Sequence, residues 1–384
     1  MSDPNESAGD VYSRGLFPVS PATHDVGLRW LFDLSTLLLL LDCRPGDRVL
    51  DLGAGSGFSS EMLARFGYDV VAVDPDGAAL ANNRRRLTFD ASRIAGTVRV
   101  TRGVAQHLPC AEGAFDGVFC MNAMHHVDDL PTALGELARV MKPGARMVFS
   151  EPGLAHLDQA ETKRARAEHG EDDLAFDVLA FLRAALDRQF GEAMLTATLQ
   201  PPLRLLPVQE IDLYLTGRHP RPHMTAAGVI EELHKHHAFG MIVRAGAKPK
   251  TSRYPGVLAG VISTDPLPAS VAAGARLVVQ ARAQNTGDTH WLARPLRHGG
   301  YVTFGAKWTD ATTGRVVTDV LGRTPLPADV PPGGTTAATL VFDLPPALPP
   351  GDYLLKVDLV DEFVCWFSDL PDNAASEHRI RIAG

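Results

Sequence analysis

The feature that most constrains this chain is a glycine-rich turn at residues 53–57. The residues before it, Val49 to Leu52, predict a short strand that is buried on both faces. The residues after it, Phe58 to Phe66, have the apolar spacing of an amphipathic helix. Because glycine has no side chain, a ligand can approach the backbone of the turn and the free N–H groups at the start of the helix. The stretch therefore predicts the first half of a nucleotide-binding unit.

Asp51 distinguishes this turn from one that holds a pyrophosphate. It stands two residues before the first glycine, where its negative charge would repel a phosphate and would suit a positively charged group. The glycine spacing also differs from the dinucleotide fingerprint G-x-G-x-x-G, because Phe58 stands where that fingerprint has its third glycine. Both differences count against a Rossmann oxidoreductase, which is the alternative from another class of enzyme.

The acid, the three glycines and the preceding strand together resemble the first motif of class I methyltransferases that use S-adenosylmethionine (SAM), here of the type 11 kind. The resemblance covers roughly residues 20 to 263. It implies an α/β fold with a Rossmann-like, doubly wound sheet of seven strands, and SAM as the cofactor. The candidate cofactor-binding residues are Asp51, Gly53, Ala54, Gly55, Ser56, Gly57, Asp74, Pro75, Ala105, Gln106, Cys120 and Asn122.

Two of these positions have a defined expected role. Asp74 ends the second predicted strand, Tyr68 to Val73, and an acid at that place can accept both ribose hydroxyls of an adenosine group. In the resembled family a residue pair before x-x-Leu-Pro caps the adenine, often as Asp-Ala. This chain has Ala105 and Gln106 there, so we expect a contact from a backbone N–H group rather than from a side chain.

Methyl transfer from SAM is a direct displacement, for which an enzyme mainly supplies alignment. A hydroxyl acceptor also needs a general base with a pKa near neutrality. The candidates after the fourth and fifth predicted strands are His125, His126, Glu151 and His156, of which His126 and His156 rank first. Two alternatives stay open: the paired histidines bond within their own loop, or the acceptor needs no base. The histidines near residue 235 lack the i, i+4 spacing of a metal-binding pair, so no metal site is expected.

The pattern divides the chain into three parts. Residues 1–22 predict a flexible segment, and residues 23–263 a methyltransferase domain. Within that domain, 155–222 predicts an insertion that covers the site, since standard connections are much shorter. Gly240 to Ala245 and Gly256 to Ser263 are predicted to be the last two strands, which form an antiparallel hairpin in the resembled family.

The composition changes at residue 264. Short alternating runs between Gly and Pro turns predict a β-sandwich over 264–384. Pro349 to Tyr353 resembles a turn of immunoglobulin-like domains, and more loosely the domain is similar to carbohydrate-binding domains appended to bacterial glycan-modifying proteins. Three tryptophans could stack on sugar rings or pack in the core: Trp291, Trp308 and Trp366.

These features together favour methyl transfer from SAM to a hydroxyl of a sugar, a glycan or another sizeable metabolite. The alternative is a non-catalytic protein with a SAM fold that binds a glycan or a protein. The partner is then a small-molecule or glycan acceptor, and a second subunit could bind through the C-terminal domain.

Composition excludes several other classes. A formal net charge of −8 argues against broad binding to nucleic acid or to an anionic membrane. The most apolar run, Leu37 to Leu41, is far too short to span a bilayer. The four cysteines are scattered without metal-ligand spacing, which predicts reduced thiols and a cytoplasmic location.

Overall fold

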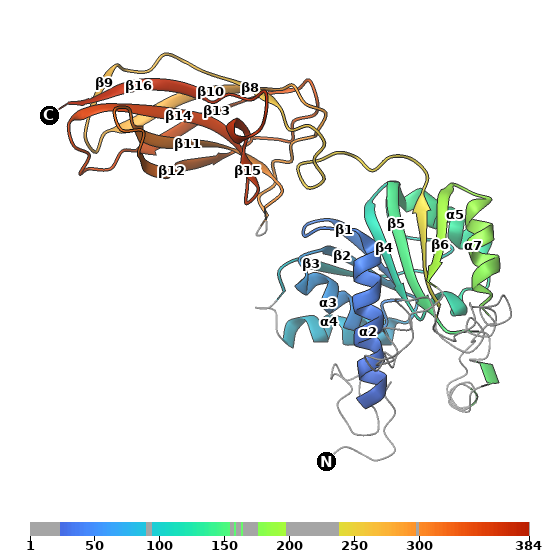
Figure 1. Cartoon of the computed structure of the whole chain (residues 1–384). Coiled ribbons are helices and arrows are strands. Elements are labelled where there is room, and N and C mark those ends of the chain that lie inside the picture. The colour runs from blue at the N-terminus through green and yellow to red at the C-terminus, as the bar shows by residue number, and fades with distance from the viewer. Residues whose placement is uncertain are drawn as a thin grey trace, which may run out of the picture. The chain divides into compact units, whose positions relative to one another are not determined.

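The computed structural model describes residues 24–89, 94–153, 157–158, 163, 176–196, 238–296 and 299–383. The chain forms two compact units, Met1–Lys248 and Pro249–Gly384 (Figure 1). The predictions for 1–22, for most of the 155–222 insertion and for the candidate base His156 lie outside the described residues.

The first unit is built on a seven-stranded sheet with the strand order β3-β2-β1-β4-β5-β7-β6. The first five strands along the chain run parallel, and β7 is antiparallel to both of its neighbours. The strands are β1 Arg48–Leu52, β2 Asp69–Asp74, β3 Thr97–Arg102, β4 Phe115–Met121, β5 Met141–Glu151, β6 Phe190–Thr196 and β7 Ala238–Arg244. This arrangement confirms the predicted Rossmann-like, doubly wound sheet.

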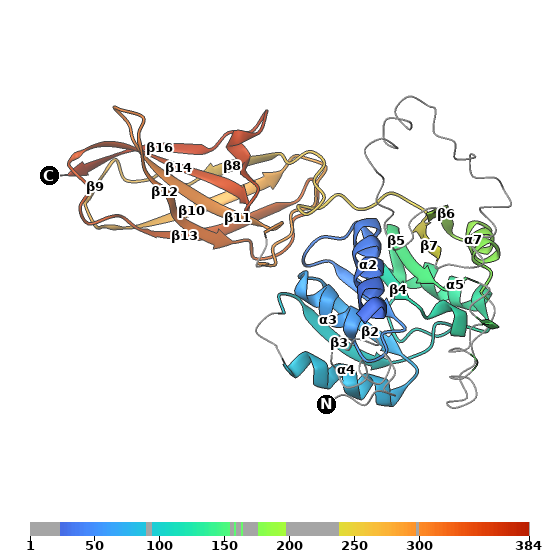
Figure 2. The ribbon, with the colours of Figure 1, turned by 60° about the horizontal axis from the view of Figure 1, so that its bottom comes forward.

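Helices cover both faces of this sheet (Figure 2). Two of them, α2 and α3, share a core with β1 and β5 on one face, and α4 packs beside α3. The other face carries α5 and α7. The helices are α2 His24–Leu41, α3 Phe58–Arg65, α4 Gly77–Phe89, α5 Leu130–Val140 and α7 Val178–Leu186, and a short 3₁₀ turn, η2, spans Met124–His126. Because both faces are covered, most residues of the central strands β1 and β4 are buried, as the run before the glycine turn predicted.

The second unit consists of two sheets that enclose a common apolar core. One has the order β13-β10-β8; the other has the order β12-β11-β14-β16-β9, with β15 paired to β14. The strands are β8 Gly260–Thr264, β9 Ser270–Ala272, β10 Arg276–Asn285, β11 Val302–Asp310, β12 Val316–Pro325, β13 Thr335–Asp343, β14 Gly351–Asp361, β15 Cys365–Trp366 and β16 Ser376–Ala383. The unit is all-β, in agreement with the composition of this region.

The predicted pairing of the last two strands of the first sheet is wrong. Residues 256–263 do not join that sheet; β8 lies there and pairs with β10 in the second unit. The strand beside β7 is β6, which comes from within the predicted insertion. The burial pattern explains the difference: Val261 and Ser263 of β8 are exposed, as in a sheet with one solvated face, whereas Met241 and Ile242 of β7 are both buried.

The second unit therefore begins well before the predicted linker. The segment after residue 248 is bonded to the loops of the second unit: the N–H of Ser252 donates to the carbonyl of His290 (3.0 Å), and the N–H of His290 donates to the carbonyl of Lys250 (2.9 Å). In the described part of the chain, no helix is both long and apolar enough to cross a membrane.

This division predicts how fragments of the chain behave. A fragment 249–384 should unfold cooperatively with a β-type circular dichroism spectrum, because it keeps β8 and the bonded segment. A fragment 266–384 exposes the edge of β10, and we expect its melting temperature to fall by roughly 10 °C or more. A fragment 245–384, which only adds residues of the first unit, is the control and should melt with 249–384. Equal melting of 266–384 and 249–384 would show that β8 contributes nothing to the second unit.

Candidate functional site

The glycine turn joins β1 to α3 at the carboxyl edge of the sheet. Its three glycines all have left-handed backbone angles, with φ of +71° at Gly53, +49° at Gly55 and +91° at Gly57. The N–H groups of Gly53 and Ala54 both donate to the carbonyl of Val73 at the end of β2 (2.9 and 3.1 Å). The turn is thus fixed to the neighbouring strand, and Ala54 and Ser56 are buried within it.

The three glycines are needed for different reasons. A Cβ atom at Gly53 would lie 2.2 Å from Cβ of Ala123, and one at Gly57 would lie 2.4 Å from Cγ of Asn83. These two glycines allow close packing on the turn after β4 and on α4. Among the described residues, no heavy atom lies within 4 Å of a Cβ atom placed at Gly55. Gly55 therefore borders open space, where a ligand has room to approach the backbone.

Asp74 at the end of β2 contacts this part of the turn. Its carboxylate accepts the N–H of Gly55 (2.8 Å) and the N–H of Asp76 (2.8 Å). Burial raises the pKa of this carboxyl, while the two backbone N–H groups act in the opposite direction. The carbonyl of Pro75 accepts from Nε of Arg102 (2.8 Å), which fixes the chain just beyond the acid. The structure thus brings the predicted Asp74 and Gly55 together.

Asp51 lies buried beneath the turn. Its Oδ2 atom accepts hydrogen bonds from the hydroxyls of Ser59 (2.8 Å) and Ser60 (2.5 Å) in the first turn of α3. Burial raises the pKa of this carboxyl to about 6, against the effect of the two serines, and the nearby Asp74 adds to the rise. The sequence analysis did not predict these two serines as site residues. The signal that could have identified them was the presence of hydroxyl side chains in the first turn of the helix. A positively charged ligand group would stabilise this carboxylate.

Glu151 at the end of β5 holds the turn that follows β4. Its fully buried carboxylate accepts the N–H groups of Ala123 (2.9 Å) and Met124 (2.8 Å) and lies 2.7 Å from Nδ1 of His125. The thiol of Cys120 is 3.7 Å away. Both carboxylate oxygens are therefore used within the protein, which supports a positioning role for Glu151 and His125 rather than direct contact with an acceptor.

Asn122 begins this held turn and has an unusual environment. Its φ is +56°, a left-handed conformation in which Asn is tolerated better than most residues. Its N–H donates to the carbonyl of Ser150 (2.8 Å), which continues the pairing of β4 with β5. The side-chain oxygen is buried and has no hydrogen-bond partner among the described residues. This oxygen is therefore a candidate acceptor for a donor from a ligand.

His126 is the exposed member of the histidine pair. Its ring lies 4.1 Å from that of buried His125, measured between centroids. It is also close enough to Asp74 for its charge to lower the pKa of that carboxyl slightly, against the larger effect of burial. Of the described candidate bases, His126 is the one whose side chain reaches solvent at this edge of the sheet.

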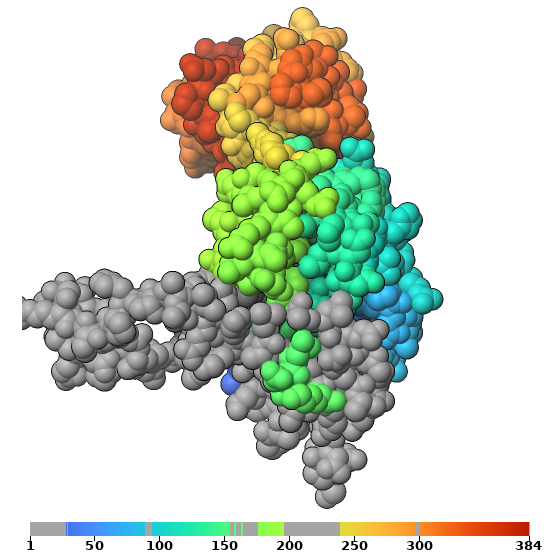
Figure 3. All heavy atoms as spheres, turned by 90° about the vertical axis from the view of Figure 1, so that its right-hand side faces the viewer, coloured from blue at the N-terminus to red at the C-terminus, as the bar shows by residue number. Residues whose placement is uncertain are grey.

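Three further predicted residues have other surroundings. Ala105 and Cys120 lie in the core, and burial raises the pKa of the Cys120 thiol well above its usual value. Gln106 donates its amide to Asp128 (2.6 Å). Gln106 also lines a hollow of about 350 Å³ whose other lining residues come mainly from α5 and include Arg188 beyond α7. Figure 3 looks onto this face, where α7 and β6 lie beside α5.

The described residues contain no cluster of three His, Cys, Asp or Glu side chains that could hold a metal ion. The tryptophans of the second unit are also accounted for. Trp291 and Trp308 are fully buried in its core, which is the packing alternative for both. The ring of Trp366 is covered by Nζ of Lys307 (4.1 Å) and the guanidinium of Arg323 (4.3 Å).

Residues 50–149 match the family model described as a methyltransferase domain. Over 152 residues the chain is 37% identical to a demethylmenaquinone methyltransferase of Beutenbergia cavernae, and the aligned region covers 39% of this chain and 59% of that protein. Over 109 residues it is 33% identical to an O-methyltransferase of Aspergillus nomiae, and the aligned region covers 28% of this chain and 47% of that protein. The chain spans about half the length of the curated relatives it matches.

Solved structures resemble the same unit. One is the methyltransferase bound to the activator Trm112 of Haloferax volcanii, with 18% identity, a TM-score of 0.44, and coverage of 62% of this chain and 96% of that one. Another is the geranyl diphosphate C-methyltransferase of Streptomyces coelicolor, with 19% identity, a TM-score of 0.42, and coverage of 64% and 86%.

The sheet order and the glycine turn place the first unit among Rossmann-like folds of the class I methyltransferase type. Within that class, residues 50–149 carry a domain of the methyltransferase family.

The packing around the glycines predicts stability effects of two different sizes. Gly53→Ala should destabilise the first unit by about 3 kcal/mol or more, because the strained φ adds to a clash with Ala123. Gly55→Ala should cost only about 1–2 kcal/mol, for the strained φ alone. Gly113, with φ of +58° and open space beside it, is the matched control and should behave like Gly55. Urea unfolding of the three variants checks this order, and a loss at Gly55 as large as at Gly53 would contradict the assignment of open space.

Proposed function

We propose that this protein is a SAM-dependent methyltransferase that acts on an acceptor hydroxyl. The observation that carries the proposal is the open space at Gly55, bordered by Asp74 and lying at the same edge of the sheet as Asp51 and Asn122. The match of residues 50–149 to the methyltransferase domain supports the same function.

The residues of this edge fit the chemical groups of SAM. Asp74 would accept hydrogen bonds from the ribose hydroxyls. These bonds would either replace the one that its carboxylate accepts from the N–H of Gly55 or form beside it. The buried carboxylate of Asp51 accepts hydrogen bonds from two hydroxyls, which carry no charge, so a cationic ligand would balance its negative charge. The unpartnered oxygen of Asn122 would accept from an ammonium or hydroxyl group. SAM supplies a methyl group on a positively charged sulfur, ready for displacement.

The protein's own part in the reaction is alignment and proton removal. His126 would accept the proton of the acceptor hydroxyl as that oxygen forms its new bond to the methyl carbon and the bond from carbon to sulfur breaks. The buried pair of His125 and Glu151 would keep the ring of His126 in place through the contact between the two tilted imidazole rings and through the held backbone. His126→Ala should therefore lower kcat more than it changes the affinity for SAM.

Two observations bear on the class of acceptor. An O-methyltransferase among the relatives favours an oxygen acceptor, and the appended all-β unit favours a sugar, a glycan or another sizeable metabolite. The non-catalytic alternative predicts SAM binding without turnover. Incubation with labelled SAM and panels of glycans, quinols and phenols separates the two. The four free cysteines support the cytoplasmic location that we propose with this function.

SAM binding at the glycine turn predicts a specific loss in one variant. Gly55→Val should weaken SAM binding at least 100-fold in calorimetric titration, because its side chain fills the open space. Gly113→Val has the same backbone strain and the same freedom from contacts but lies away from the site, so it should bind SAM like the parent. Equal binding by the two variants would place the cofactor elsewhere.

The raised pKa of Asp51 predicts how SAM affinity depends on pH. Because the folded pKa lies above that of the unfolded chain, ionisation of Asp51 costs stability as the pH rises from about 4 to about 6. A bound cation offsets this cost, so affinity should fall by roughly tenfold between pH 7 and pH 5, where the carboxyl takes up its proton. Asp51→Asn should bind more weakly and lose most of this dependence. If SAM affinity depended on pH in Asp51→Asn as it does in the parent, Asp51 would not interact with the bound ligand.

A further inference from the structure

The outer face of the β13-β10-β8 sheet presents an ordered set of polar groups. Strand β10 alternates strictly between buried and exposed residues, so every second side chain points away from the core. The strand register places Arg282 between Ser263 and Ala337, and Gln284 between Val261 and Thr335. Each of the two rows thus has one long polar side chain, flanked by shorter ones.

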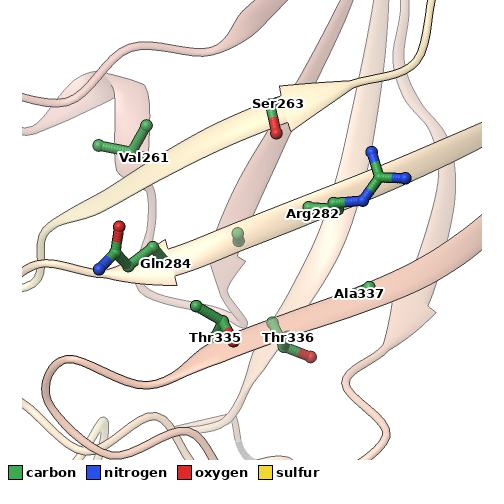
Figure 4. Close-up of a pocket in the computed structure, with 8 residues that line it drawn as sticks. Val261, Ser263, Arg282, Gln284, Thr335, Thr336 and Ala337 are labelled. Atoms are coloured by element: carbon green, nitrogen blue, oxygen red, sulfur yellow. The ribbon is translucent and has the colours of Figure 1, made fainter.

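This pattern produces a hollow in the sheet face, which we name the β10 groove. It has a volume of about 440 Å³, within the usual range for ligand sites. The small side chains of Ser263, Thr335 and Ala337 leave room beside Arg282 and Gln284. Figure 4 shows these side chains on three adjacent strands. The groove is lined by Val261, Ser263, Arg282, Ala283, Gln284, Thr335, Thr336 and Ala337.

The groups in the groove are suited to hydrogen bonding without net charge. The guanidinium of Arg282 donates to Asp265 (2.7 Å), so its charge is balanced within the protein. The same holds further along the strand, where Arg276 pairs with Asp343 (2.8 Å). The remaining polar side chains that line the groove are Ser263, Thr335, Thr336 and Gln284, whose hydroxyl and amide groups can both donate and accept.

We propose that the β10 groove binds a neutral, polyhydroxylated chain, such as an oligosaccharide. Hydroxyls, an amide and a paired guanidinium match the alternating donors and acceptors of sugar rings, and Val261, 61% exposed, offers apolar contact to their C–H groups. Paired charges give no field to attract a phosphate or a nucleic acid. An added peptide strand would need a free sheet edge, whereas this groove lies on the face.

The β10 groove goes beyond the proposed function, since it lies in the second unit and needs no methyl transfer. The two ideas can fail separately. If the protein did not bind SAM, the proposed methyltransferase function would be refuted and the proposal for the β10 groove would stand. If it bound no oligosaccharide, only the proposal for the groove would be refuted.

The test is calorimetric titration of the full chain with a panel of neutral probes: maltoheptaose, cellohexaose, chitohexaose and a mannan oligosaccharide. Heparin serves as the anionic comparison. We expect at least one neutral probe to bind, and Ala337→Trp, which fills the groove, to weaken that binding at least tenfold. Val341→Trp is the matched control, because Val341 faces outward on the same strand but lies outside the groove.

Arg282→Met, compared with Arg276→Met, tests the guanidinium in the same way and covers the case in which the tryptophan variant fails to fold. Only the first of these should weaken binding, by about fivefold or more, with melting temperatures matched. The proposal is overturned if no neutral probe binds, if heparin binds more tightly than every neutral probe, or if the groove variants and their controls bind alike.

Discussion

The buried carboxylate of Glu151 holds the carboxyl edge of the first sheet together. It accepts the backbone N–H groups of Ala123 and Met124, and thereby fixes the turn after β4. The side chain of Ala123 in turn occupies the space that a Cβ at Gly53 would need, so the β4 turn and the glycine turn are packed against each other. Each donor left without this carboxylate would cost about 1–3 kcal/mol. The glycine turn is therefore closely packed at Gly53 and at Gly57, whereas Gly55 borders open space among the described residues.

The local parts of this site could be predicted from the sequence. Strand, glycine turn, helix and the acid at the end of β2 follow each other within thirty residues, and each has a local signal in residue type or spacing. The contact between Asp74 and Gly55 then follows from the parallel pairing of β1 with β2. Asp129 also makes a local contact of this kind, because it caps α5 with its carboxylate accepting the N–H of Thr132 (3.0 Å).

Contacts between distant parts of the chain could not be predicted. From the sequence alone, Glu151 was a candidate for a catalytic acid or base. Its positioning role becomes visible only in the structure, where its carboxylate lies 2.9 Å from the backbone nitrogen of Ala123, which is distant in sequence. The wrong assignment of β8 to the first sheet, in the place that β6 occupies, also results from a contact between distant parts of the chain. A short alternating strand fits either sheet until its partner strand is known. The tryptophans show the same limit: burial of Trp291 and Trp308 depends on which face of each strand meets the core.

A crystal structure of the full chain with S-adenosylhomocysteine tests the central claim most directly. The account predicts that the ligand lies over Cα of Gly55, with a ribose hydroxyl about 2.7 Å from the carboxylate of Asp74 and a donor within hydrogen-bond distance of the side-chain oxygen of Asn122. A ligand bound elsewhere, with Asp74 bonded as before to Gly55 and Asp76 alone, would contradict it.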